Sequence, residues 1–240
     1  MRPLHSASKK LSSNPHAKFC AGLEKKSLGY RGGKDFIAAS SPPREMGVRI
    51  AITGGIAEGK TTVLRLFESL GGQTISSDAI VATLLRPGTD LWQQLRKEFG
   101  ETIITATGEL DRERLAQLAF GDPFMRRRLN RLLHPAAFNA IQPYLEGEAS
   151  AAPLFIEVPL LIEVCLQNWF DRIIVVQATP ALQQARLLAR GIAPSLARQM
   201  LRSQLPTRAK VPFADWVVRT HCSLDEVERQ VRRIWASIGR

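Results

Sequence analysis

The sequence predicts an α/β fold built on a parallel five-stranded sheet, and two observations indicate it. Short apolar runs bounded by breaker residues recur along the chain, as buried parallel strands do. Segments with helical spacing of apolar residues lie between these runs, and strands that alternate with helices favour a doubly wound sheet. The expected strands are 48–52, 73–75, 153–158, 172–178 and 215–220.

Helical spacing predicts the connecting elements, and one interval departs from simple alternation. Between residues 79 and 148 several helical patterns occur without a convincing strand, and this is too much helix for a simple crossover. We interpret the interval as a helical insertion that covers one edge of the active site. The helices expected along the chain are 61–70, 90–99, 111–120, 122–144, 180–190, 195–204 and 224–238.

Bulk composition is that of a soluble globular protein. The chain has 240 residues, 45% hydrophobic and 23% charged, enough for one α/β domain with an insertion. Its four histidines are scattered and its three cysteines widely spaced, which argues against a metal cage made only of protein ligands. No apolar stretch approaches the roughly 20 residues of a membrane span, and no secretory signal is evident. We expect a cytoplasmic protein without a membrane partner.

The positive charge is unevenly distributed. The net charge is +11, and residues 1–45 hold nine Lys and Arg against three acidic residues, without apolar periodicity. We expect this segment to be a disordered basic leader. Because Met46 stands immediately before the first expected strand, we hypothesise that translation starts there and that the folded domain is 46–240. A genuine basic tail or an organelle transit peptide remains the alternative.

The clearest motif is a complete G-x-x-x-x-G-K-[ST] pattern between an expected strand and an expected helix. Main-chain N–H groups of such a turn form an anion nest at the helix N-terminus. Lys60 would reach the β- and γ-phosphates, and the Thr61 hydroxyl is placed to ligate Mg²⁺. The chain therefore binds a nucleoside triphosphate through a P-loop made of Gly54, Gly55, Ile56, Ala57, Glu58, Gly59, Lys60 and Thr61.

Asp78 is the candidate catalytic base. It follows the second expected strand, so it lies at the carboxyl edge of the sheet, where open α/β folds bind ligands. A carboxylate near the γ-phosphate can accept the proton of an attacking hydroxyl and orient it in line. Asp78 is equally suited to starting the next helix, and the two roles are compatible.

The segment from Ala51 to Thr89 resembles the start of dephospho-CoA kinases, in which a P-loop is followed by a D-A-D segment and a helix that ends near P-G. Further similarities follow in order along the chain: GELDRERLAQLAF, LNRLLHP, VPLLIE, ARLLAR and FADWVV. This collinear set spans nearly all of 46–240 and is more specific than the P-loop alone. It implies a P-loop kinase fold and transfer of the ATP γ-phosphoryl group to the ribose 3′-hydroxyl of dephospho-CoA, the last step of CoA synthesis.

The resemblance also implies roles for individual residues. Asp78 is the base that orients the 3′-hydroxyl, residues 54–62, including Thr62, form the ATP site, and Glu157 holds Mg²⁺ through water. The resemblance further implies a helical lid at about 180–210. Arg190 of this lid reaches over the phosphates and Arg208 lies on the adenine side, whereas Arg186 either assists or forms a solvated face. The acceptor pocket is assigned to Asp78, His134, Pro159 and Leu160.

The chain departs from the family pattern at several positions. Ser76 replaces the first aspartate of the D-A-D segment, which removes a like charge near Asp78. The P-loop reads A-E-G-K-T where the family usually has G-S-G-K-S. Ala57 tests whether its position needs a positive φ, and Glu58 adds an acid beside the phosphates, which we expect to point to solvent. After Val218 the family tends to Asn-Gly, so adenine contacts at 219–222 differ.

Other functions are weighed on charge and motifs. Another small-metabolite kinase, a nucleic-acid-dependent ATPase and a binding-only protein are the alternatives. The charge is concentrated in the leader and aromatic content is only 7%, which argues against nucleic acid. Lys60 and Asp78 argue against a dead kinase. We expect ATP and dephospho-CoA as the only partners of a monomer or small homo-oligomer.

Overall fold

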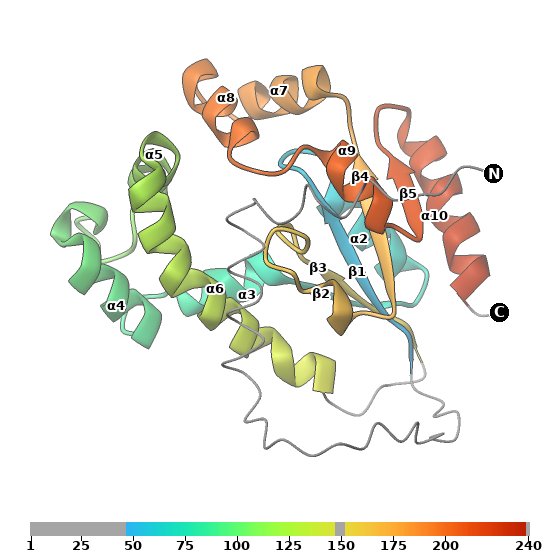
Figure 1. Ribbon diagram of the computed structural model, residues 1–240, viewed down its shortest axis with the longest axis horizontal. Coiled ribbons are helices and arrows are strands. Elements are labelled where there is room, and N and C mark those ends of the chain that lie inside the picture. Colours follow the sequence, from blue (N-terminus) through green and yellow to red (C-terminus); the bar gives the residue numbers. More distant parts are fainter. Residues whose placement is uncertain (1–46, 147–151, 239–240) are drawn as a thin grey trace, which may run out of the picture.

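The computed structural model describes residues 47–146 and 152–238 and contains a five-stranded, all-parallel sheet (Figure 1). The strand order is β2-β3-β1-β4-β5, so β1 lies at the centre between β3 and β4. The predicted fold class is confirmed. The strands are β1 (Arg49–Gly54), β2 (Gln73–Ser76), β3 (Leu154–Glu157), β4 (Arg172–Gln177) and β5 (Trp216–Arg219).

Two apolar layers hold the sheet. On one face, α2 (Lys60–Ser69) and α10 (Leu224–Ile238) bury Phe67 and Val231 against the strand residues Ile52 and Ile174. On the other face, the C-terminal part of α6 (Pro123–Glu146) and the turn after β3 pack against the alternate strand side chains. Because both faces of the sheet are covered, the central strands β1, β3 and β4 read as largely apolar runs, which is why they could be predicted. The edge strand β2 is Gln-Thr-Ile-Ser and is only partly buried.

The interval after β2 is helical and has a core of its own. It contains α3 (Ser77–Leu84), α4 (Asp90–Phe99), the 3₁₀ turn η2 (Glu101–Ile103), α5 (Arg112–Gly121) and the long α6. In Figure 1 α4 and α5 lie well away from the sheet. Leu91, Leu95, Leu115 and Leu129 form a cluster that contains no strand residue. We call residues 77–146 the helical insertion.

The remaining helices lie beside the P-loop. The helices α7 (Pro180–Ala189) and α8 (Pro194–Arg202) share a small core with Ile56 and Ala57 of the loop. The short helix α9 (Thr207–Lys210) and the 3₁₀ turns η3 (Gln167–Trp169) and η4 (Val211–Phe213) were not predicted, because three or four residues carry no readable period. Helix α5 of the insertion contacts α8.

The expected basic leader, 1–45, and the proposed start at Met46 lie outside the described residues. None of the helices in 47–146 and 152–238 has the length and apolar character that a membrane crossing requires.

Candidate active site

The P-loop occupies the turn between β1 and α2, where the motif predicted it. Gly54 has φ 152° and Gly59 has φ 92°, both conformations that favour glycine. A Cβ on Gly54 would also collide with the Val176 carbonyl oxygen of the neighbouring strand. Ala57 has φ 58°, so its position does need a positive φ, although the residue there is not glycine. The loop backbone is therefore held in a conformation that side chains disfavour.

Side chains from outside the loop hold its carbonyl groups. Gln183 Nε2 donates to Ile56 O at 2.8 Å and Arg186 Nη1 donates to Ala57 O at 3.0 Å, both from α7. Thr220 Oγ1 donates to the carbonyl oxygen of Glu58 at 2.6 Å. In a trans peptide the carbonyl and the following N–H point in opposite directions. Fixing three successive carbonyls on the outer side therefore turns the N–H groups of residues 57–59 inward, as an anion nest requires.

Lys60 opens α2 and lies across the loop. Its side chain is mostly buried, and Nζ donates to Gly55 O at 2.9 Å. Burial lowers the pKa of the Lys60 ammonium below its usual value of 10.5, while the charges of Glu157, Asp78 and Glu58 oppose that shift. A cation that is partly desolvated and poorly neutralised is well suited to receive a polyanion.

Glu157 ends β3 beside the P-loop. It is 3% exposed, and Thr61 Oγ1 donates to its Oε2 at 3.5 Å. Burial raises the pKa of the Glu157 carboxyl above 4.5, Lys60 lowers it, and repulsion from Asp78 raises it further. Ser76 also hydrogen-bonds Glu157, and its Oγ accepts from Ala79 N at 3.3 Å as the N-cap of α3. The serine that replaces an aspartate here thus caps a helix and adds no like charge.

Asp78 lies in the first turn of α3 with an exposed side chain. It is close enough to both Lys60 and Glu157 to act on their pKa values. The carboxyl ends of β1, β2 and β3 thus bring Lys60, Asp78 and Glu157 to one place, although they are separated by up to 97 residues in the numbering.

Glu58 does not point to solvent, and that prediction is wrong. The side chain is 1% exposed. Its Oε2 accepts from Gly55 N at 2.5 Å and its Oε1 accepts from Thr207 Oγ1 at 2.6 Å. The prediction failed because it treated the acid as a neighbour of phosphate. The carboxylate in fact occupies the outer side of the loop, where two donors satisfy it.

The arginines expected to act on phosphates differ in their surroundings. Arg190 is the C-terminal residue that caps α7, and its side chain is exposed. Arg186, one turn earlier, is half-buried and holds both Ala57 O and Thr220, donating to Thr220 Oγ1 at 3.2 Å and to Thr220 O at 2.9 Å. Arg186 is therefore no solvated face: it fixes the P-loop to the segment after β5.

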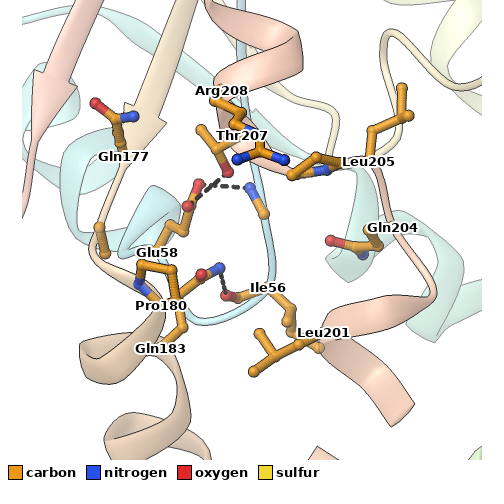
Figure 2. A pocket seen from close by; sticks show the side chains of 13 residues that line it. Ile56, Glu58, Gln177, Pro180, Gln183, Leu201, Gln204, Leu205, Thr207 and Arg208 are labelled. Carbon is orange, nitrogen blue, oxygen red and sulfur yellow. Dashed lines mark hydrogen bonds between the residues drawn. The ribbon is translucent and has the colours of Figure 1, made fainter. Parts of the chain in front are cut away.

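A cavity of about 200 Å³ lies against the outer side of the P-loop (Figure 2). The loop contributes Ile56 and Glu58, α7 contributes Gln183, and the start of α9 contributes Thr207 and Arg208. Arg208 is exposed and its guanidinium group lies beside Thr207 in Figure 2. The proposed adenine-side arginine thus lines a pocket that the P-loop itself helps to form.

Lys210, at the end of α9, was missed by sequence reasoning. It is completely buried, and Nζ forms an ion pair with Glu163 Oε1 at 2.8 Å and donates to Pro159 O at 2.9 Å. A lone lysine in the segment TRAK looks like a surface residue, and only the buried acidic partner in VPLLIE could have suggested otherwise. Pro159 O also accepts from Thr53 Oγ1 at 3.3 Å, so this turn is tied to the central strand.

The residues assigned to the acceptor pocket come from two elements. His134 lies half-buried on α6, and burial lowers the pKa of its imidazole below 6.5. Pro159 and Leu160 are half-buried in the turn after β3. No group of three or more His, Cys, Asp or Glu side chains in 47–146 and 152–238 is arranged to hold a metal ion.

Comparison with known proteins places this architecture in a family. The family model for dephospho-CoA kinase matches residues 48–226. A dephospho-CoA kinase of Leifsonia xyli is 35% identical over 79% of this chain and 98% of its own length. One from Arabidopsis thaliana is 32% identical over 80% of this chain and 84% of its own.

Solved structures agree with the fold. TT1252 from Thermus thermophilus has a TM-score of 0.65 at 30% identity and covers 80% of this chain and 98% of its own. A dephospho-CoA kinase from Campylobacter jejuni has a TM-score of 0.57 at 22% identity and covers 79% of this chain and 96% of its own. A shikimate kinase from Acinetobacter baumannii has a TM-score of 0.51 at 15% identity and covers 81% of this chain and 94% of its own. This likeness shows the fold alone. On the sequence comparisons, the chain belongs to the dephospho-CoA kinase family.

Proposed function

We propose that this protein transfers the γ-phosphoryl group of ATP to the ribose 3′-hydroxyl of dephospho-CoA, giving CoA and ADP. One observation carries the proposal. A P-loop whose amides are turned inward lies beside Lys60, Glu157 and Asp78 at a single edge of the sheet. Membership of the family supplies the identity of the acceptor. The substrates are water-soluble, and we propose that the enzyme acts in the cytoplasm as a monomer or small homo-oligomer.

The ATP site is assigned to residues 54–62. The inward N–H groups bind the phosphate oxygens, and Lys60 adds a positive charge toward the β- and γ-phosphates. Its lowered pKa supports this role. Burial has taken water away from the Lys60 ammonium group, and a bound polyanion would stabilise the charge of that group in place of the water. Phosphoryl transfer needs positioning and charge stabilisation more than covalent chemistry, and a rigid nest provides both.

Asp78 is assigned as the base that orients the 3′-hydroxyl. The carboxylate is exposed at the carboxyl edge, so an acceptor can reach it. The effect of its charge on the pKa of Lys60 supports a role on the γ-phosphate side of the loop. A hydroxyl that donates to Asp78 has its lone pair free for in-line attack.

Mg²⁺ fits the residues at this edge. Magnesium typically keeps several waters and takes only one or two protein ligands besides the phosphates. Thr61 Oγ1 and Glu157 Oε2, 3.5 Å apart, supply one hydroxyl and one carboxylate that can act directly or through water. When bound, the ion neutralises charge on the transferring phosphoryl group.

The acceptor and the lid complete the assignment. His134, Pro159 and Leu160 line the acceptor side, and a neutral imidazole at His134 suits hydrogen bonding better than charge pairing. Arg190 and Arg208 are exposed, so both guanidinium groups are available to phosphate when α7 and α8 close over the nucleotide.

The test is an acceptor panel. Purified protein is incubated with Mg·ATP and dephospho-CoA, shikimate, gluconate or a nucleoside, and both ADP and the phosphorylated product are measured. We expect ADP and CoA in equal amounts with dephospho-CoA alone. Turnover with another acceptor, or ADP formation that needs DNA or RNA, would overturn the assignment.

A further inference from the structure

We propose that Glu58 is a positioning residue for the nucleotide: its buried carboxylate fastens the P-loop to α9 and so couples loop geometry to the segment that carries Arg208. The proposal rests on the proposed ATP site but not on the identity of the acceptor. It concerns a position at which this chain departs from the serine that the family pattern usually has.

The Glu58 carboxylate is buried, and each of its oxygens accepts a hydrogen bond. A carboxylate that is 1% exposed loses most of its hydration, a cost of several kcal/mol unless donors replace the lost water. Here two donors do so, Gly55 N–H on Oε2 and the Thr207 hydroxyl on Oε1. Figure 2 shows the carboxylate directed at Thr207. Each oxygen thus has one partner, one within the loop and one outside it.

Gly55 makes room for this arrangement. A Cβ at position 55 would lie 2.8 Å from Gln183 Nε2, 3.1 Å from Thr207 Oγ1 and 3.2 Å from Glu58 Cδ. The end of the Gln183 side chain would have to shift, and Thr207 and Glu58 would have to move by a few tenths of an ångström. Gly55 therefore serves the Glu58–Thr207 contact as well as the phosphate nest.

Through Thr207 the contact reaches the rest of the site. Thr207 begins α9, Arg208 follows it, and Lys210 ends the helix by binding Pro159 O and Glu163. The four-residue helix is thus tied at one end to the P-loop and at the other to the turn assigned to the acceptor. A shift of the loop on nucleotide binding is transmitted to Arg208 and to that turn through two buried charged contacts.

The contact uses a carboxylate of this length, whose two oxygens accept from the two donors. In a Glu58→Gln variant the amide oxygen can still accept from Gly55 N–H, and the NH₂ group can donate to the Thr207 hydroxyl, which also accepts. This variant therefore keeps the geometry of the contact and replaces charge-assisted hydrogen bonds by weaker neutral ones. A serine in this place, as in the usual family pattern, is too short to reach Thr207.

The experiment measures ATP affinity by calorimetry in three single variants and one double variant. Thr207→Val keeps the shape and removes the hydroxyl, Thr207→Ser keeps the hydroxyl, and Glu58→Gln keeps the size and removes the charge. A hydrogen bond to a charged group commonly contributes enough for roughly a tenfold to hundredfold change in affinity. We expect Thr207→Val and Glu58→Gln each to weaken ATP about tenfold, and Thr207→Ser to bind like the wild type.

Two further readouts separate positioning from general stability. Because the two groups share one contact, the Glu58→Gln/Thr207→Val double variant should bind ATP no worse than Glu58→Gln alone within about twofold. The KM for ATP should rise about tenfold in both single variants, while the KM for dephospho-CoA should change less than twofold. If Glu58→Gln fails to fold, the comparison of Thr207→Val with Thr207→Ser is sufficient to test the proposal.

The outcomes are distinct. Wild-type ATP affinity in folded Thr207→Val overturns the proposal, and so does equal weakening by Thr207→Val and Thr207→Ser, which would show packing rather than hydrogen bonding. If the wild type binds ATP but does not phosphorylate dephospho-CoA, the proposed function fails while the affinities of the variants still decide this inference.

Discussion

The P-loop and the helical insertion contribute to one candidate site in different ways. The loop is eight consecutive residues whose function depends on main-chain groups, and side chains from α7, α9 and the segment after β5 hold it from outside. The insertion contributes separate side chains, Asp78 on α3 and His134 on α6, and rests on its own apolar cluster. The loop is therefore held from several sides, whereas α4 and α5 of the insertion pack on a cluster without strand residues and the C-terminal part of α6 joins the insertion to the sheet.

The difference has a physical consequence for catalysis. A nest of amides must be preorganised before phosphate arrives, because reorganisation during the reaction would cost rate. An acceptor site must open and close to admit substrate and exclude water. Damage to the loop should therefore remove chemistry outright, whereas damage to the insertion should affect the acceptor and leave ATP binding intact.

Lys60→Ala should have the largest effect. Removing a cation from the transferring phosphoryl group commonly costs about 10³- to 10⁵-fold in rate, so we expect kcat with dephospho-CoA to fall about 10⁴-fold. Arg65→Ala is the matched control, because Arg65 is exposed on the same helix. Steady-state kinetics and circular dichroism check the pair. An active Lys60→Ala enzyme would mean that the loop acts without its lysine.

Asp78→Asn should be next. Loss of a general base typically costs 10²- to 10⁴-fold, and we expect kcat to fall about 10³-fold while ATP affinity changes less than threefold. Asp90→Asn, also an exposed acid in the first turn of an insertion helix, should leave both unchanged. Rapid-quench kinetics with separate ATP titrations measure the two effects. Unaltered turnover in Asp78→Asn removes this carboxylate from the mechanism.

How much of this site was predictable depends on the distance between partners in the sequence. The P-loop and the central strands were predicted because a glycine motif and apolar runs are local signals. Glu58 was misplaced because Thr207, its partner, lies 149 residues further along the chain. The burial of Lys210 depends likewise on Glu163, 47 positions earlier and on the far side of β4 and α7. Arg186 was left undecided, since an arginine on a helix gives no sign that a carbonyl at Ala57 will face it.

The two lid arginines should separate binding from chemistry. Arg186→Ala releases Ala57 O and Thr220 and should raise the KM for ATP about tenfold, because the nest loses one of its outer contacts. Arg190→Ala removes an exposed guanidinium and should lower kcat about 10- to 100-fold with little change in ATP affinity. Steady-state kinetics of both variants, with the concentrations of ATP and dephospho-CoA varied in turn, measure kcat and the KM for ATP. A large rise in the KM for ATP in Arg190→Ala, with an unchanged KM in Arg186→Ala, would contradict the proposed role of the lid.

Leu95→Ala tests whether the insertion is energetically separate from the sheet. Leu95 is fully buried in the insertion core, and such truncations cost about 2–5 kcal/mol. We expect hydrogen exchange to accelerate in α4 and α6, the KM for dephospho-CoA to rise several-fold and ATP affinity to stay unchanged. Equal loss of ATP binding would show that the two regions are one cooperative unit.

The smallest effect is a pH dependence of stability at Glu157. Burial raises the pKa of the folded protein's carboxyl above 4.5, so its protonated form contributes stability that is present below the unfolded pKa and lost as pH rises through the folded pKa. Glu157→Gln cannot ionise and should lose less stability across that window. Thermal unfolding of both proteins without nucleotide, as a function of pH, checks this. Parallel curves would mean that Glu157 does not titrate differently on folding.

The most direct test of the central claim is a structure of the complex with a non-hydrolysable ATP analogue, Mg²⁺ and dephospho-CoA. The account predicts that the terminal phosphate lies in the loop against Lys60, and that the ribose 3′-hydroxyl lies within hydrogen-bonding distance of Asp78, about 3–3.5 Å from the γ-phosphorus. A 3′-hydroxyl remote from Asp78, or a terminal phosphate outside the loop, would contradict it.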